Sequence, residues 1–485
     1  MEPIFDLAID IPAKGSREML RSLHRQLRAA IVDGRLQPGL RLLPTRLLAR
    51  RLGISRNTVL AAYEILLSEG YVVTRIGSGT YVAEELPIIR RSRSPARISP
   101  DDQRIAPFWR KHHLPPPLLP TPACRFDLRA GFPDLTRFPF DVWQRLSTKA
   151  SRTLSKRKIV PEEPQGRSAL REAIAKHVSF ARAVACGSND VVVTNGTRQA
   201  LDLLARILVT PGKTQVAIED PCLMPVRRAF AGAGARIAPV PVDHEGLVVS
   251  LLPRSARVIY VSPSHQFPLG CAMSARRRGA LLDFARRRGA VIIEDDYDSE
   301  FRLDNKPLDA LQTLDRDHTV FYVGTFSKSM FPALRLGYVV TPPWARDALV
   351  AAKRFADAHS PVIAQDALAT FISEGHLARH IRKMRKVYSG RHAALVEALE
   401  RYCSDRLRPI PASAGVHLAA EFIRPCKTRD VVAAAAEADV SLASLESFAH
   451  RKRSPRGLVF GYGAIDLDDI EPAIRRLAGV MRTTM

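Results

Sequence analysis

The sequence predicts an α/β protein in which a small basic unit precedes a larger domain built on a mostly parallel, doubly wound sheet. Three observations support this prediction. The chain has 485 residues, more than the roughly 100–200 residues of one ordinary domain. Strand-like and helical segments alternate from residue 126 to residue 485, as a doubly wound sheet requires. A stretch rich in proline and arginine separates this region from the first 83 residues.

Composition and charge narrow the class of protein. Hydrophobic residues make up 46% of the chain and charged residues 25%, as in globular proteins with a sizeable core. The 73 Lys and Arg residues against 49 Asp and Glu give a net charge of +24, which favours a polyanionic partner; a solvated arginine surface is the alternative. The absence of a signal-peptide pattern and of a long apolar run predicts a cytoplasmic protein with no membrane partner. The six scattered cysteines predict reduced, mostly structural thiols and no metal site.

The first unit begins with a supporting helix and continues with two short helices. Leu20, Leu23, Leu27 and Ile31 recur at helical spacing until Gly34. Residues 45–52 and 55–69 then read as helices, and each is closed by a glycine. This spacing predicts a helix-turn-helix, with the N-terminus of its second helix facing the major groove of DNA.

A predicted hairpin follows the helix-turn-helix. Residues 71–75 and 80–82 read as strands, and residues 76–79 supply the glycines of the turn, as a wing would require. Between Lys14 and Ala83 twelve Lys or Arg residues face four Asp or Glu residues. This excess suits a surface that meets phosphates, although a basic helical domain that binds protein is the alternative.

The motifs of this unit resemble a known family. Arg-Leu-Gln-Pro-Gly at residues 35–39, Leu-Leu-Ala-Arg-Arg-Leu-Gly-Ile-Ser-Arg-Asn-Thr-Val at 47–59 and Ala-Tyr-Glu at 62–64 closely resemble the DNA-binding domain of the GntR family. The resemblance implies double-stranded operator DNA as partner, with Asn57 able to pair bidentately with adenine. The DNA-contacting residues that it implies are Arg46, Ser55, Arg56, Asn57, Thr58, Arg75, Gly77 and Gly79. Residues 42–46 depart from the family pattern, which shifts the helix cap before Arg46 by one position.

A linker is predicted between the two regions. Residues 84–125 contain nine prolines, and their clustered arginines repel one another, so this segment should be extended. We therefore expect a DNA-binding domain at 14–83, a linker at 84–125 and an effector domain at 126–485.

Three strand ends of the large domain carry candidate chemistry. Residues 191–194 run into Asn195-Gly196-Thr197, a glycine turn that aims helix amides at an anion, although many such turns bind nothing. Residues 290–293 run into Glu294-Asp295-Asp296-Tyr297-Asp298, which places carboxylates where ligands collect in such sheets; a cap or an ion pair is the alternative.

The third strand end is the most specific. Residues 320–323 run into Gly324-Thr325-Phe326-Ser327-Lys328, and Arg335 follows seven residues after the lysine. A lone lysine is usually a solvated charge. An amine just beyond a strand end, beside hydroxyls and an arginine, suits a Schiff base with a phosphorylated aldehyde.

Together these motifs resemble fold type I aminotransferases, and with the winged unit the chain resembles the MocR subfamily of GntR-family regulators from about Lys14 to Met481. The resemblance implies a PLP-dependent transferase fold type I domain with a smaller C-terminal α+β subdomain, pyridoxal 5'-phosphate as cofactor, and a homodimer. It gives Lys328 the Schiff base, Asp295 the pyridine nitrogen and Tyr297 the ring hydroxyl. The cofactor-binding residues that it implies are Gly196, Thr197, Gln266, Asp295, Tyr297, Thr325, Ser327 and Arg335, with His265 or Gln266 beside the ring or capping a strand end.

Two positions depart from the aminotransferase pattern. Leu223 stands where an aromatic residue would stack on the cofactor, and Val459 stands where amino-acid-binding relatives carry an arginine that grips a carboxylate. Arg456 or a residue of another subunit could replace that arginine, although Arg456 also reads as a surface residue. An ordinary α-amino acid effector is therefore not assured.

The sequence leaves three functional hypotheses. The first is a DNA-binding transcription regulator whose aminotransferase-like domain senses pyridoxal phosphate or an amino compound. The second is a working aminotransferase with an appended DNA-binding unit, which the departures at Leu223 and Val459 disfavour. The third is a scaffold without cofactor.

Overall fold

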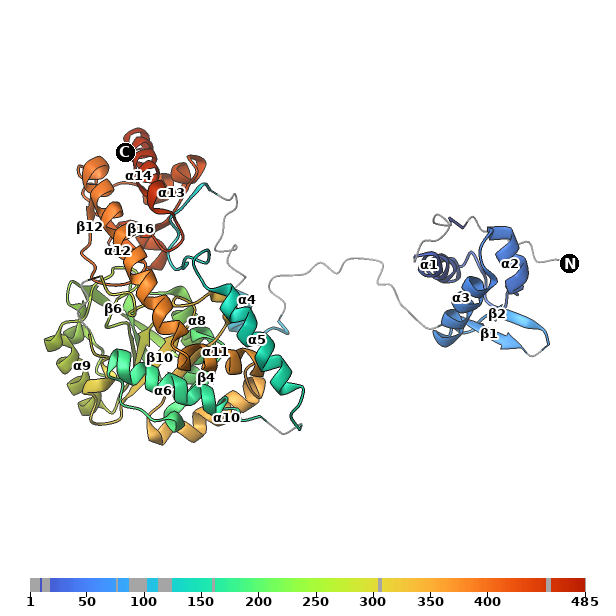
Figure 1. Cartoon of the computed structure of the whole chain (residues 1–485), viewed down its shortest axis with the longest axis horizontal. Helices are drawn as coiled ribbons and strands as arrows, with labels where there is room; N and C mark the ends of the chain where they lie inside the picture. The colour runs from blue at the N-terminus through green and yellow to red at the C-terminus, as the bar shows by residue number, and fades with distance from the viewer. Residues whose placement is uncertain are drawn as a thin grey trace. The chain divides into compact units, whose positions relative to one another are not determined.

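The computed structural model divides into two compact units, Met1–Asp102 and Gln103–Met485 (Figure 1). It describes residues 9–10, 18–75, 77–86, 103–111, 124–158, 162–303, 308–450 and 455–484. Most of the predicted linker, residues 87–102 and 112–123, lies outside the described residues. Its described part contains a short helix, α4 (Pro107–Lys111), which packs against α8 (Met224–Gly232) of the second unit.

The first unit is a helix-turn-helix with a wing, as predicted. Its elements are α1 (Met19–Val32), α2 (Thr45–Leu52), α3 (Arg56–Ser68), β1 (Val72–Arg75) and β2 (Gly79–Val82). The strands pair antiparallel, with Arg75 opposite Gly79. The helices close over fully buried side chains that include Leu27, Leu48 and Leu66. The Tyr63 hydroxyl donates a hydrogen bond of 2.9 Å to the Leu43 carbonyl, which ties α3 to the segment before α2.

The turn between α2 and α3 follows from local chemistry. Gly53 adopts φ 66°, a left-handed conformation that ends α2 and that glycine adopts without strain. The Ser55 hydroxyl then accepts a hydrogen bond from the Asn57 amide at the start of α3. The predicted helix bounds are therefore confirmed within one or two residues.

The second unit is built on one eight-stranded sheet of order β4-β11-β10-β9-β8-β5-β6-β7. The run from β10 to β6 is parallel, and β11 is antiparallel to both β10 and β4. The strands are β4 (Val191–Thr194), β5 (Gln215–Asp220), β6 (Arg236–Asp243), β7 (Gly246–Leu247), β8 (Ala256–Val261), β9 (Val291–Asp296), β10 (Val320–Thr325) and β11 (Gly337–Val340). This confirms the mostly parallel sheet.

Helices cover both faces of this sheet, because successive strand residues are buried in different clusters. Val191 and Val193 of β4 pack with one set of helices, and Val192 between them packs with another. The helices of this unit are α5 (Phe140–Leu154), α6 (Ser168–Arg182), α7 (Thr197–Leu208), α8, α9 (Ala275–Arg288), α10 (Arg346–Asp357), α11 (Val362–Ser373), α12 (His376–Cys403), α13 (Thr428–Glu437) and α14 (Leu467–Thr484). The sheet is thus doubly wound.

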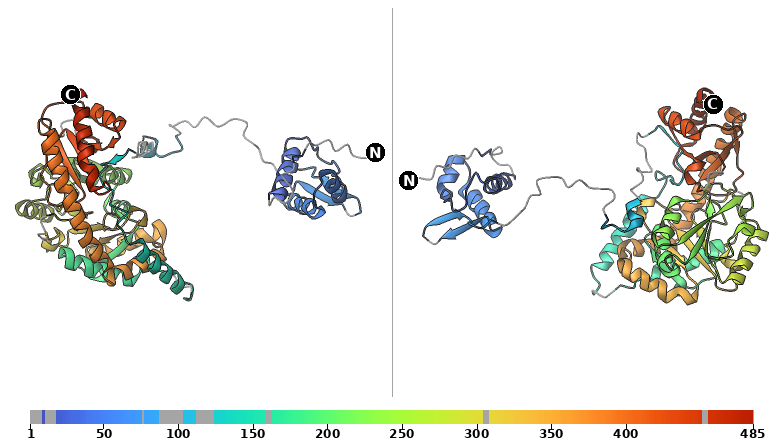
Figure 2. Two further views of the ribbon diagram at one scale, coloured as in Figure 1. Left: turned by 45° about the horizontal axis from the view of Figure 1, so that its top comes forward. Right: turned by 180° about the vertical axis from the view of Figure 1, so that it is seen from behind.

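The C-terminal part forms the predicted smaller α+β subdomain. Its antiparallel sheet has the order β12-β13-β16-β15 and packs with α13 and α14 (Figure 2). The strands are β12 (Leu407–Pro409), β13 (His417–Phe422), β15 (Ala443–Ser444) and β16 (Gly457–Gly461); a separate pair joins β3 (Phe126–Asp127) to β14 (Val440–Ser441). Among the described helices, none has the length and apolar character needed to cross a membrane.

Candidate functional site

The candidate site is centred on Lys328, in the turn that follows β10. Its amine donates a hydrogen bond to the Gly131 carbonyl. Gly131 adopts φ 94°, and a Cβ there would lie 3.1 Å from the amine nitrogen, so glycine permits this approach. Burial lowers the pKa of Lys328, while the carboxylates of Asp298 and Asp295 raise it. A lowered pKa increases the fraction of neutral amine, the form that attacks a carbonyl carbon.

Asp295 reaches the site from the end of β9. Its side chain is 2% exposed, and its Oδ2 accepts a hydrogen bond of 2.5 Å from the Tyr260 hydroxyl. Burial raises the pKa of Asp295 to about 7. Oδ1 is buried and has no hydrogen-bond partner among the described residues. Such an oxygen lacks a donor, and the protonated nitrogen of a pyridine ring would supply one.

Tyr297 follows Asp295 and is held by a histidine. Its hydroxyl lies 3.2 Å from His265 Nδ1, and the same nitrogen lies 2.9 Å from Asp298 Oδ1. An ionised Asp298 can only accept, so Nδ1 carries the hydrogen and the Tyr297 oxygen is a second acceptor for it. The proton of Tyr297 is then left to donate to a further partner. Asp298 and His265 therefore orient the tyrosine as a donor.

His417 of β13 is a further residue of the candidate site, which the sequence did not predict. Its ring centroid lies 4.5 Å from that of His265, and its Nε2 donates to the Pro268 carbonyl at 3.2 Å. Burial, with the neighbouring His265, holds the pKa of His417 well below its usual range. His265, Asp298 and His417 each place one possible metal-ligating atom within 4.8 Å of the others. The cysteine and histidine spacing in the sequence could not reveal this group, because its members come from three distant segments.

The turn after β4 forms a cradle with Arg335. Gly196 adopts φ 79°, and a Cβ there would lie 2.9 Å from Arg335 Nη2. The guanidinium donates a hydrogen bond of 2.8 Å to the Asn195 carbonyl, and Thr197 begins α7 beside it. Burial and the nearby charge of Arg198 lower the pKa of Arg335. Within the described part of the chain no carboxylate forms an ion pair with Arg335, so a cation and a helix N-terminus are left for an anion.

Two hydroxyls lie at the end of β10. Thr325 Oγ1 is 3.1 Å from Ser327 Oγ and accepts a hydrogen bond of 3.2 Å from the Ser327 amide. This pair forms the turn that presents Lys328.

Gln266 is engaged by the backbone around it. Its Nε2 donates hydrogen bonds of 2.7 Å to the carbonyls of Pro221 and Phe267, and its Oε1 accepts one of 3.1 Å from the Leu269 amide. Through these hydrogen bonds the Gln266 side chain holds its own loop against the backbone at Pro221. A cofactor contact by Gln266 stays a prediction.

Leu223 and Val459, the two departures from the aminotransferase pattern, both have apolar side chains that cannot donate or accept hydrogen bonds. Leu223 precedes α8 and is half-buried. Val459 is fully buried in β16, in an apolar cluster that includes Leu269 and Ala419. Arg456 is exposed.

Glu219 at the end of β5 is a further buried carboxyl that the motifs did not single out. It accepts a hydrogen bond of 3.1 Å from the Ser262 amide, and burial raises its pKa to about 8. A carboxyl with this pKa retains much of its proton near neutrality, so Glu219 adds little negative charge beside Asp295.

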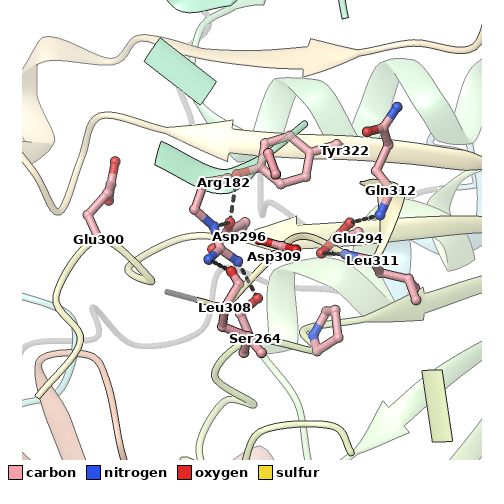
Figure 3. Close-up of polar contacts among 12 residues, drawn as sticks. Arg182, Ser264, Glu294, Asp296, Glu300, Leu308, Asp309, Leu311, Gln312 and Tyr322 are labelled. Carbon is pink, nitrogen blue, oxygen red and sulfur yellow. Dashed lines mark hydrogen bonds and ion pairs between the residues drawn. The ribbon is translucent and has the colours of Figure 1, made fainter. Parts of the chain in front are cut away.

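A second layer of contacts holds the strand that carries Asp295 (Figure 3). Arg182 forms a 2.7 Å ion pair with Asp296, whose carboxylate also accepts a hydrogen bond of 2.6 Å from Tyr322. Glu294 accepts hydrogen bonds from the Leu311 and Gln312 amides. Side chains alternate between the faces of a strand, so Glu294 and Asp296 have the capping and ion-pair roles while Asp295 faces Lys328.

The candidate nucleic-acid interface lies in the first unit. Arg46, Arg56 and Asn57 are exposed, whereas Thr58 is half-buried and the Ser55 hydroxyl caps α3. The exposed guanidinium and amide groups at the start of α3 are free to meet base edges or phosphates.

The wing carries Arg75, whose guanidinium lies 4.8 Å from the centroid of the Tyr81 ring and 3.2 Å from Glu84 Oε1. Gly77 adopts φ 72° with open space around it, and Gly79 lies against the Arg41 side chain. Ile76, which belongs to the predicted turn, lies outside the described residues.

Comparisons with known proteins match both units. Residues 137–435 match the model of aminotransferase class I and II, and residues 21–82 match that of bacterial regulatory proteins of the gntR family. The chain is 36% identical over 482 residues to the probable rhizopine catabolism regulatory protein MocR of Rhizobium meliloti, covering 98% of this chain and 94% of that protein. It is 30% identical to the pyridoxine biosynthesis transcriptional regulator PdxR of Corynebacterium glutamicum, over 96% of each chain.

A solved structure matches the second unit. The kynurenine aminotransferase of Pyrococcus horikoshii, in complex with PMP, superposes with a TM-score of 0.69 at 25% identity, covering 75% of this chain and 92% of that one. Asp295 Oδ1, which has no partner among the described residues, the cradle of Gly196 and Arg335 and the amine of Lys328 fit the ring nitrogen, the phosphate and the aldehyde of pyridoxal phosphate. The cofactor of this domain is pyridoxal phosphate.

Proposed function

The chain belongs to the MocR subfamily of GntR-family transcription regulators, and we propose that its winged unit reads operator DNA while its aminotransferase-like domain senses pyridoxal phosphate or an amino compound. One observation carries the proposal: a single chain joins a helix-turn-helix, with exposed Arg56 and Asn57 at the start of its second helix, to a site around Lys328 that fits this cofactor. The departures at Leu223 and Val459 support a sensing role over turnover, because they lack the stacking and carboxylate-gripping groups of a catalyst.

On the cofactor side, pyridoxal phosphate supplies an aldehyde with which primary amines condense. Lys328 is the amine of the chain that binds it, Asp295 holds a proton at the ring nitrogen, and Tyr297 donates to the ring hydroxyl under the orientation set by His265. The phosphate is held by residues at the strand ends and in the following turns. These are Gly196, Thr197, Thr325, Ser327 and Arg335.

On the DNA side, the start of α3 enters the major groove. Arg56 and Thr58 reach bases or phosphates, and Asn57 pairs with adenine. Arg46 and Ser55 contact the backbone, while Arg75, Gly77 and Gly79 bring the wing close to the minor groove. The exposure of Arg46, Arg56 and Asn57 supports these roles.

Regulation couples the two units. The protein acts as a cytoplasmic homodimer, and a ligand that binds one arrangement of the dimer more tightly changes how the two winged units meet operator half-sites. The effector is the cofactor itself or an amino compound that reacts with it. An effector gripped by its carboxylate is disfavoured, because Val459 offers only carbon where such a ligand needs a cation.

One titration tests the proposal. Purified protein, with and without pyridoxal phosphate, is titrated against the intergenic DNA upstream of its own gene while the visible absorbance of the bound cofactor is followed. A cofactor-dependent change in specific DNA binding is the expected result. If the cofactor binds and DNA affinity is unchanged, the cofactor alone is not the effector and amines are added next.

A second candidate function is transamination, which the joint presence of Lys328, Asp295 and Tyr297 in one site favours. Its test is the transfer of an amino group from a panel of amines to α-keto acids by the protein loaded with cofactor. Sustained turnover would make the chain an enzyme with an appended DNA-binding unit.

A further inference from the structure

Helix α5 of the second unit carries a basic stripe on its exposed face. Arg145, Lys149 and Arg152 recur at intervals of four and three residues, so they follow one side of the helix, and Lys156 continues this spacing in the turn after Leu154. All four are exposed. The opposite side of α5 is covered by α11, and there Leu146 and Ala150 are buried. The stripe is therefore the solvent-facing half of an amphipathic helix.

The positive charge of the stripe is not neutralised by neighbouring carboxylates of the described residues. Among the described residues, none of the four stripe side chains forms an ion pair, and Asp141 is the one acidic residue that lines the same face. Polar neighbours such as Gln144, Thr148 and Thr153 line a hollow of about 690 Å³ between the stripe side chains. Elsewhere in this unit basic residues are often neutralised: Arg276 and Arg277 of α9 bond to Glu245, for example.

We propose that the basic stripe of α5 is a second DNA-contacting surface, which binds the phosphate backbone of the duplex outside the bases read by the winged unit. The proposal rests on the proposed function, because the winged unit brings the duplex to this chain and raises its concentration near the second unit. From Arg145 to Arg152 the helix rises about 10 Å, the length of roughly three base pairs of duplex. Each cation that meets a phosphate releases counterions and needs no particular base sequence.

A second copy of this chain is a poorer occupant of the stripe. A two-fold axis through this face would set cations against the same cations of the other copy, at a cost in free energy. Duplex DNA has the opposite charge and the hydroxyl-rich neighbours can donate further hydrogen bonds to phosphate oxygens.

The test compares a stripe variant with a matched control on the full chain. The variant replaces Arg145, Lys149, Arg152 and Lys156 by Gln. The control removes the same charge elsewhere on the unit, by replacing exposed Arg254, Arg287, Arg382 and Lys386 by Gln. In Figure 1, α9, which carries Arg287, lies on the other side of the unit from α5. Both proteins are titrated with a mixed-sequence 60-base-pair duplex and with a 16-base-pair duplex at several salt concentrations.

The stripe variant should have a smaller salt slope than the wild type on the long duplex and an unchanged slope on the short duplex. Four phosphate contacts at a slope of about 0.9 each mean that, between 50 and 200 mM salt, the wild type loses on the order of 100-fold more affinity than the variant. The control should have nearly the same salt slope as the wild type on both duplexes. In the wild-type complex, Lys149 and Lys156 should also be protected from acetylation, while Lys386 should not.

The outcomes separate the two proposals. Equal slopes for variant and control, or unprotected Lys149 and Lys156, would overturn the stripe as a DNA contact. A changed oligomeric mass of the stripe variant in light scattering would assign the face to contacts between copies and overturn it as well. If the wild type binds neither duplex, the DNA-binding function itself is wrong, and the stripe fails with it.

Discussion

The two sites expected to bind ligands, the start of α3 and the region around Lys328, differ in how their side chains are held. The side chains expected to meet DNA at the start of α3 are exposed, and Arg56 and Asn57 take no part in the core of their unit. Among the side chains expected to meet the cofactor, Asp295 and Tyr297 are buried and, like the neighbouring His265, are already joined to neighbours by hydrogen bonds, whereas Lys328 is half-buried and Arg335 is exposed. A phosphate-rich surface can be met by mobile charges, whereas a small ring needs fixed donors and acceptors. Substitutions should therefore affect binding alone in the first unit, and both binding and stability in the second.

The largest effect is expected at Lys328. Lys328→Ala should abolish covalent cofactor binding and its visible absorbance, because no other amine is placed in this turn. Basal DNA affinity should be unchanged, since the lysine belongs to the second unit. Absorbance and fluorescence anisotropy with DNA measure the two properties in one sample. An equal loss of DNA binding would break the division between the units.

The buried carboxyl of Asp295 should make stability depend on pH in protein without cofactor. The folded state holds the proton up to a pKa of about 7, whereas an aspartate side chain in an unfolded chain has its ordinary pKa of 3.8. The unfolding free energy should therefore fall as pH rises from about 4 to about 7, by up to about 4 kcal/mol at 1.36 kcal/mol per unit.

Asp295→Asn should remove that part of the pH dependence. Denaturant unfolding followed by the fluorescence of Trp143 and Trp344 at pH 5 and pH 7.5 measures it. Burial raises the pKa values of Glu219 and Glu294 in both proteins, and the charge of Asp295 adds to the rise at Glu219, so the difference between variant and wild type reports Asp295 together with its effect on Glu219. Parallel pH profiles would show that this carboxyl is not held protonated.

The group formed by His265, Asp298 and His417 leaves no room for a side chain at Gly415. A Cβ at Gly415 would lie 2.0 Å from His265 Cε1 and 2.7 Å from Asp298 Oδ2, and Gly415 adopts φ 92°. Gly415→Ala should cost about 3 kcal/mol of unfolding free energy and displace the group that orients Tyr297. The control Gly279→Ala, at an exposed position of α9 where a Cβ would have no described heavy atom within 4 Å, should instead stabilise by about 1 kcal/mol. Thermal unfolding of both variants sharpens the contrast, and a stable Gly415→Ala protein would contradict it.

The smallest effect is expected in the first unit. Arg56→Ala should weaken specific DNA binding by about 1–3 kcal/mol if Arg56 reads a base, or mainly lower the salt slope if it meets phosphate. Its melting temperature should not change, because the side chain is exposed. Arg35, exposed in the turn after α1, is the matched control for a lost charge. Unchanged affinity and unchanged slope would reject the assignment of α3 as the recognition helix.

Sequence reasoning reached the fold because each signal was local. Gly53 closes α2 as predicted, and Ser55, the predicted first residue of the second helix, is the cap one residue before α3 begins. Strand ends followed by Gly196, Asp295 and Lys328 come in the order that brings them to one edge of a parallel sheet. Local patterns could not reveal Gly131, Tyr260 or His417, whose roles depend on contacts across more than 100 positions of separation or between different strands.

The sequence by itself determined the two kinds of unit, the lysine and the anion-binding turn, because periodicity, glycine positions and strand-end motifs are properties of short segments. The tertiary structure alone decided how neighbouring carboxyls differ. Glu294, Asp295 and Asp296 are consecutive, yet Glu294 caps backbone amides, Asp296 pairs with Arg182, and Asp295 keeps one oxygen that has no hydrogen-bond partner in the described part of the chain. The physical reason is that the side chains of neighbouring strand residues point to opposite faces of the sheet, and only tertiary packing determines which groups each side chain contacts there.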